Sequence, residues 1–169
     1  MEKYKLNFEL IPTTCAEQNL RTVMTEVEWS RISRMVRENA NLTCECCGKK
    51  VLAISQLEAH EVWKYKKVDV KGKTKRIQKL NTIDALCIKC HRVKHAGRSI
   101  SMGYGEQVQE QFCLVNGCTV REYHKALVEA LEKNEKRSKH KWLLCFDIDK
   151  ILTKIFKNRE EYDGEREYI

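Results

Sequence analysis

Apolar residues recur at helical spacing early in the chain and predict an N-terminal helix. Trp29, Ile32 and Val36 repeat every three to four positions, so they would share one face of a helix. Thr25 and Glu28 have the spacing of a capping box, which favours a helix start at Thr25. Residues 1–20 show no such pattern and are expected to be irregular.

The second half of the chain carries two more helical stripes. Val108, Phe112 and Val115 would lie on one face of a helix that ends at Gly117. Thr119 and Glu122 form a second capping box. The apolar stripe expected after it consists of Val120, Tyr123, Leu127, Ala130 and Leu131. A last buried element is expected to contain Trp142, Leu143, Phe146 and Ile148. After it we expect a charged tail that frays from Lys154.

The pattern changes between Asn41 and Gly97, where short β-like runs replace the helical stripes. We expect strands at Leu57–Val62 and Arg76–Leu80, joined by a loop, and a short helix at Ile88–His95. Gly97 stands where a helix C-terminal cap is expected. These elements predict an α+β fold organised as one compact domain. Its parts are an N-terminal helical flank (1–40), a central core (41–97), a C-terminal helical flank (98–152) and a charged tail (153–169).

Composition favours a folded protein with an acidic partner. Hydrophobic residues make up 42% of the 169 residues, and the formal net charge is +8. Residues 64–79 hold eight lysines and arginines against one aspartate, so this stretch alone carries +7. A solvated, mobile loop would explain the run, and so would contacts with nucleic-acid phosphates. The candidate phosphate-binding residues are Lys64, Lys66, Lys67, Lys71, Lys73, Lys75 and Arg76.

Cysteine usage indicates metal binding in a reducing compartment. The N-terminus has no signal-peptide pattern, and the longest apolar run, Trp142–Phe146, is far shorter than the ~20 residues of a membrane span. We therefore expect a cytoplasmic protein, in which clustered cysteines bind metal more often than they form disulfides.

Two C-x-x-C pairs predict a structural zinc site. Cys44 and Cys47 precede Gly48, and Cys87 and Cys90 form the second pair. Four thiolates complete a closed tetrahedral zinc site, which a redox dithiol would not require. Cys46 is adjacent to Cys47 and is not expected to chelate with it. Small apolar roles are assigned to Cys15, Cys113, Cys118 and Cys145.

Three histidines predict a second metal site. His91 and His95 are four residues apart, so they share one face of the expected helix. His60 lies on the preceding strand and can reach the same ion if the strand and the helix pack together. Three histidines leave coordination positions open, which is typical of a catalytic site. His124 and His140 are given no role.

The segments CECCG, LEAHEVWKY and LCIKCHRVKH together resemble the HNH endonucleases with the ββα-metal fold. The surrounding segments NLRTVMTEVEW, VNGCTV and KWLLCFDI look like a bacterial and phage subfamily with a His-Glu-Val-Trp strand, over roughly residues 6–150. The resemblance implies phosphodiester hydrolysis assisted by one divalent ion. It implies His60, His91 and His95 as ligands of that ion.

The chain departs from the family pattern at the general base. The second strand position, usually histidine in the family, is Glu61 here, and a glutamate is a weak base near neutral pH unless burial raises its pKa. In an alternative register His60 is the base, and the ion rests on His91 and His95. Asn81 is the candidate for the asparagine of the His-Asn-His motif. The alternative is that Asn81 is a polar residue of a turn or a helix cap.

The leading hypothesis is a metal-dependent endonuclease that acts on DNA, most simply double-stranded DNA. It would hold structural zinc and one catalytic Mg²⁺, Mn²⁺, Ni²⁺ or Zn²⁺. One alternative is a zinc-stabilised nucleic-acid-binding module that has lost catalysis. Another is a protein-interaction module, because about half of the chain lies outside the central motif. The sequence leaves the oligomeric state open.

Overall fold

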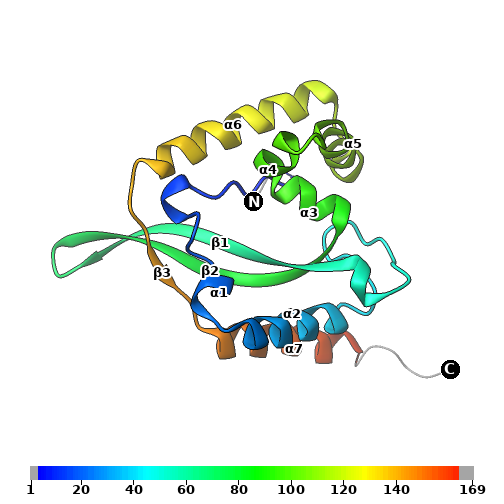
Figure 1. Ribbon diagram of the computed structural model, residues 1–169, viewed down its shortest axis with the longest axis horizontal. Coiled ribbons are helices and arrows are strands. Elements are labelled where there is room, and N and C mark those ends of the chain that lie inside the picture. The colour runs from blue at the N-terminus through cyan, green and yellow to red at the C-terminus, as the bar shows by residue number, and fades with distance from the viewer. Residues whose placement is uncertain (1–3, 164–169) are drawn as a thin grey trace.

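The structure is a computed structural model that describes residues 4–163, with side chains through residue 156. It is an α+β fold in which helices cover both sides of a small twisted sheet (Figure 1). The sheet consists of β1 (Leu57–Val70), β2 (Lys73–Cys87) and β3 (Leu143–Cys145), in that order. The α-helices are α1 (Leu20–Val23), α2 (Glu26–Asn39), α3 (Ile88–Lys94), α4 (Ala96–Ser101), α5 (Gly105–Asn116), α6 (Val120–Ser138) and α7 (Ile148–Asp163), and η1 (Thr13–Cys15) and η2 (Ile54–Gln56) are 3-10 turns.

Strands β1 and β2 form a long antiparallel hairpin whose tip extends beyond the helices (Figure 1). The loop expected within residues 64–79 is therefore wrong, because the basic stretch is paired along its length. β-branched residues such as Val68, Val70 and Ile77 recur along this stretch, which suits a pleated ribbon. The turn has two residues, Lys71 and Gly72, with φ values of 50° and 74°. Two positive φ values are the geometry that matches the twist of a tight hairpin.

The helix starts expected from capping boxes are confirmed. The Thr25 side chain accepts from the Glu28 backbone and the Glu28 carboxylate accepts from the Thr25 N–H, at the start of α2. Thr119 and Glu122 repeat the arrangement at α6. Gly117 ends α5 in the left-handed conformation, as its position predicted.

The expected cap at Gly97 is wrong. Helix α3 ends at Lys94, the chain bends at His95, and Gly97 lies inside the following helix α4. Residue 97 has no positive φ, and a Cβ there would meet Leu10 at 3.6 Å. Gly97 is therefore explained by helix–segment packing and not by chain reversal.

The N-terminal segment contributes to the core although it lacks regular structure. Leu6 is completely buried, and Asn116 of α5 both donates to its carbonyl and accepts from its N–H. Phe8 stacks on Phe112 with ring centroids 4.7 Å apart and an angle of 6° between the rings. The segment thus packs against α5, on the side of the sheet that α3–α6 cover (Figure 1).

The C-terminal expectations are confirmed only in part. Trp142 is buried, but Leu143 is 56% exposed, and Phe146 also reaches solvent. The reason is that β3 pairs with β2 through its backbone, in parallel, so its side chains need no burial. In the stripe on α6, Tyr123 is buried, whereas Val120 and Leu131 are about half exposed.

The expected charged tail at 153–169 is instead largely helical, because α7 continues to Asp163. The rest of that prediction, residues 164–169, lies outside the described residues. Helix α7 lies with α1 and α2 on the side of the sheet opposite α3–α6 (Figure 1). In the part of the chain with described coordinates, no helix combines the length and apolar character needed to cross a membrane.

Replacement of Phe112 by alanine should strongly destabilise the protein. The ring is fully buried and contacts Tyr4, Phe8 and Tyr123. Its removal leaves a cavity and should lower the free energy of unfolding by about 3–5 kcal/mol. Chemical unfolding measures the loss. Leu114→Ala, on the exposed side of the same helix, is the control and should change stability by less than about 0.5 kcal/mol. Equal losses for the two variants would contradict this packing.

Candidate metal centres

The four cysteines of the two C-x-x-C pairs converge on one point. Their sulfur atoms all lie within 4.8 Å of one another, and they belong to Cys44, Cys47, Cys87 and Cys90. The first pair sits in a tight turn in which the Gly48 N–H donates to the Cys44 carbonyl at 2.8 Å. Gly48 has a φ of 76°, a conformation that favours glycine. This group can hold a metal such as zinc, as the spacing predicted.

The second pair joins the sheet to α3. Cys87 is both the last residue of β2 and the N-cap of α3, and Cys90 lies in the first turn of that helix. The first pair is fixed to the same strand, because the Glu45 N–H donates to the Ala85 carbonyl and the Glu45 carboxylate accepts from the Ala85 N–H. The cysteine group therefore ties residues 44–48 to the junction between the hairpin and α3.

The electrostatics of the four thiols favour a bound cation. Hydrogen bonds from Cys87 and Cys90 are the main reason why the pKa of Cys44 is lowered. The hydrogen bond between Cys90 and Cys44 raises the pKa of Cys90, which is the donor. Burial raises the pKa of Cys47 to about 11. Without a cation the sulfurs therefore share protons, and a divalent ion would stabilise all four as thiolates.

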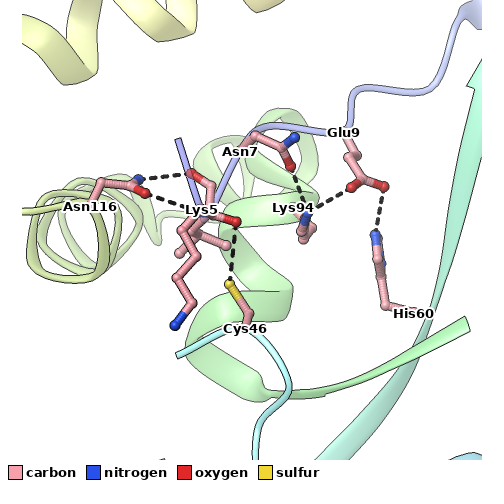
Figure 2. Close-up of polar contacts among 8 residues, drawn as sticks. Lys5, Asn7, Glu9, Cys46, His60, Lys94 and Asn116 are labelled. Carbon is pink, nitrogen blue, oxygen red and sulfur yellow. Dashed lines mark hydrogen bonds and ion pairs between the residues drawn. The ribbon is translucent and has the colours of Figure 1, made fainter. Parts of the chain in front are cut away.

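One side chain from another helix donates to this group, and a neighbouring cysteine stays out of it. The Gln111 side chain, from α5, donates to the sulfur of Cys90 at 3.2 Å. Cys46 is not part of the group, and its thiol instead donates to the Lys5 carbonyl at 3.8 Å (Figure 2). The expected exclusion of Cys46 is consistent with this geometry. Of the remaining cysteines, Cys15 is buried, Cys113 and Cys118 are half-buried, and Cys145 is exposed, so the apolar role expected for Cys145 is wrong.

The three histidines form a second group. His60 on β1, His91 on α3 and His95 at the end of α3 each place one ring nitrogen within 4.8 Å of the others. Burial lowers the pKa of His91 to about 3 and that of His95 to about 4. Both imidazoles are therefore neutral at physiological pH, and a neutral imidazole is the form that binds a metal ion.

Carboxylates occupy one ring nitrogen of two of these histidines. The Nε2 atom of His60 lies 3.0 Å from Glu9, and its Nδ1 atom is buried with no hydrogen-bond partner in the structure. The Nδ1 atom of His91 pairs with Glu58. A histidine that binds metal through one nitrogen commonly donates through the other to a carboxylate, which fixes the ring and raises its basicity. The arrangement leaves His60 Nδ1 and His91 Nε2 for a metal ion.

Glu9 is itself held in place by a buried lysine. Lys94 of α3 donates to Glu9 and to Asn7, both at 2.6 Å, and the Glu9 N–H donates to the Lys94 carbonyl (Figure 2). Burial opposes ionisation of Glu9, but the hydrogen bond from His60 and the charge of Lys94 outweigh it and lower its pKa. Glu9 could not be predicted from the sequence, because no motif links it to a histidine 51 positions away.

The histidines line an open cavity of about 920 Å³. Its walls come from β1, the N-terminal segment and helices α1, α2, α3, α4 and α6, so it reaches around the free edge of the sheet. Three arginines, Arg21, Arg92 and Arg98, also line it, and none of them follows from the motifs in the sequence. The cavity can therefore take an anion next to a metal ion.

Glu61 lines the cavity but its carboxylate is already engaged. One oxygen accepts from the Leu20 N–H at 2.9 Å, at the start of α1, and the other accepts from the Trp63 indole N–H at 3.2 Å. Alternation along β1 turns Glu61 to the face opposite His60. Burial raises its pKa, as a base near neutral pH would need. The contacts favour a role in anchoring α1 to the sheet.

Asn81 and the basic residues lie outside this cavity. Asn81 is the unpaired residue of a bulge in β2, since Val62 pairs with Thr82 and Trp63 pairs with Leu80. Asp84, and not Asn81, is the residue that pairs with His60 across the hairpin. The candidate phosphate-binding residues Lys64, Lys66, Lys67, Lys71, Lys73, Lys75 and Arg76 all lie on the projecting hairpin, and all but the half-buried Arg76 are exposed.

No protein-family model matches the sequence, and comparisons with curated proteins and with solved structures also gave no match. The chemistry of the two groups therefore rests on their geometry.

Replacement of Cys87 by serine should lower bound zinc by about one equivalent per chain relative to the wild type. It should also lower the thermal midpoint by roughly 10 °C or more, because a metal bound only by the folded state stabilises it. Atomic emission and calorimetry measure the two effects. Cys145→Ser, at an exposed site, is the control and should retain both properties. Unchanged zinc content in Cys87→Ser would contradict this centre.

Replacement of Glu61 by glutamine should destabilise the protein by about 1–3 kcal/mol. The amide can accept from only one of the two N–H donors and faces the other with its own N–H₂ group. Chemical unfolding of this variant is compared with that of Glu129→Gln, at an exposed position of α6. Stability equal to that of the control would contradict the anchoring role and favour the base implied by the resemblance.

Proposed function

We propose that the protein is a metal-dependent endonuclease of the HNH type that cleaves DNA. The observation that carries this proposal is the group of three converging imidazoles, two of which have a carboxylate on one ring nitrogen. Three protein ligands leave positions open for a substrate oxygen and water. In this proposal, β1, β2 and α3 are the ββα-metal core, and the four cysteines hold structural zinc.

The chain's own residues would prepare the site before a substrate binds. His60, His91 and His95 would bind the cation through ring nitrogens, and burial keeps His91 and His95 in the neutral form that binding needs. Glu9 and Glu58 fix the rings of His60 and His91, so little reorganisation is needed when the cation binds. A divalent cation there would supply positive charge to a phosphate oxygen and lower the pKa of water. Mg²⁺, Mn²⁺, Ni²⁺ and Zn²⁺ remain the candidate ions, with histidine ligands favouring the last three.

The projecting hairpin supports nucleic acid as the substrate class. Lys64 pairs with Lys79, Val68 with Lys75, and Val70 with Lys73, so five lysines including Lys66 share one face of the ribbon. The opposite face carries Tyr65, which packs on Trp142 and under the guanidinium of Arg137. A two-stranded ribbon fits the major groove of duplex DNA, and unpaired lysines attract phosphates at any sequence.

Supercoiled plasmid incubated with the protein should be nicked only when a divalent ion is present. His91→Ala should lower cleavage by about 100-fold or more, because it removes one ligand of the cation. The assay uses EDTA and then each of the four ions in turn. His124→Ala, at an exposed position of α6, is the control and should cleave like the wild type.

Intact plasmid in every condition, from protein that retains zinc, would overturn the nuclease proposal. The same protein is then tested for retardation of DNA in a gel at low salt. Retardation without cleavage would favour the nucleic-acid-binding module, for which the lysine face of the hairpin is the supporting observation.

A further inference from the structure

Three guanidinium groups border the histidine cavity, and they come from three different elements. Arg21 belongs to α1, Arg92 to α3 and Arg98 to α4. Arg92 is fixed, because its guanidinium lies 3.8 Å from the centre of the Tyr104 ring and donates to Gln107 at 2.5 Å. Arg21 and Arg98 are exposed at the opening of the cavity. Arg21 also lies over an aromatic ring, 5.3 Å from the centre of Trp29. The arrangement places two exposed cations beside the more firmly held Arg92.

The three carboxylates that line the cavity already have partners, whereas the two exposed arginines on its rim have no ion-pair partner among the described residues. Glu9 binds His60 and Lys94, Glu58 pairs with His91, and Glu61 accepts two N–H donors. By contrast, neither Arg21 nor Arg98 forms an ion pair within residues 4–156. The rim is therefore a place where an added anion gains charge neutralisation without displacing a carboxylate.

Both rim arginines line the same cavity as His60, His91 and His95. Helices α1 and α4 lie on opposite sides of the sheet (Figure 1), and β1 is the edge strand between them. The two arginines therefore reach one cavity from helices on the two sides of a free sheet edge.

We propose that Arg21 and Arg98 are a phosphate-binding pair that holds the DNA backbone across the edge of β1, one phosphate on each side of the histidine centre. The proposal rests on the function proposed above and adds a path for the substrate. Arginine suits this role because its planar fork donates two parallel hydrogen bonds to a phosphate. The lysines of the hairpin would add sequence-independent affinity at a distance, and the two arginines would set the position of the cleaved bond.

The experiment measures binding and cleavage separately. Wild type, Arg21→Gln, Arg98→Gln and Arg98→Lys are titrated without added divalent ion, at several salt concentrations, with a fluorescent duplex DNA of about 20 base pairs, long enough to reach several phosphate contacts. Arg31→Gln is the matched control, because Arg31 is exposed on α2 and does not line the cavity. Cleavage of the same duplex is then measured with the most active divalent ion, and metal content and melting temperature confirm that each variant is intact.

Each glutamine variant should weaken DNA binding roughly tenfold and lower the slope of log affinity against log salt by about 0.9 for the lost phosphate contact. Arg98→Lys should keep the slope but lose cleavage rate at saturating DNA, since a lysine keeps the charge and loses the fork. Glutamine variants with the affinity and slope of Arg31→Gln would overturn the proposal even if cleavage is normal. Weakened binding of the two variants, from protein that never cleaves, would support the phosphate pair and refute the nuclease.

Discussion

The convergence of four cysteine sulfurs at the end of the hairpin is the constraint on which both candidate centres depend. Cys87 closes β2 and caps α3, and Cys90 lies one turn into that helix. When the first pair, at Cys44 and Cys47, is drawn to the same point, the start of α3 has a fixed position against the sheet. His91 follows Cys90 directly, so the direction of its ring toward β1 is set by the same group.

The second centre adds a segment from outside the hairpin and α3. Glu9 lies in the irregular N-terminal stretch, and it reaches His60 because Lys94 holds its other oxygen (Figure 2). A buried lysine is costly unless it is paired and hydrogen-bonded, and Lys94 has both Glu9 and Asn7 as partners. The same contacts therefore satisfy a buried cation, attach the N-terminal segment and orient a candidate metal ligand. These shared contacts explain why an irregular segment is buried in the core.

Two kinds of positive surface meet this centre, and their geometry suggests different contributions. The lysines lie on a long ribbon that projects from the body, where flexible ammonium groups interact with any phosphate. The arginines border the cavity itself, and one of them is held by an aromatic ring and a glutamine. Under the proposed function, the first surface would supply affinity that depends on salt, and the second would set the position of a phosphate relative to the histidines.

The sequence by itself determined the features that depend on short chain separations. The two C-x-x-C pairs, the spacing of His91 and His95, the capping boxes at Thr25 and Thr119, and the end of α5 at Gly117 all follow from residues a few positions apart. Local backbone geometry decides such contacts, so the pattern predicts them.

Only the tertiary structure decided which distant groups meet. Glu9 reaches His60 across 51 positions, and Glu61 binds the backbone of Leu20 across 41. Arg21 and Arg98 line one cavity although their helices, α1 and α4, lie on opposite sides of the sheet. The basic stretch at residues 64–79 is likewise expected to be a loop from its sequence. The structure shows that its two halves pair with each other as a hairpin. Such contacts depend on how whole elements pack, and no local spacing along the chain encodes that packing.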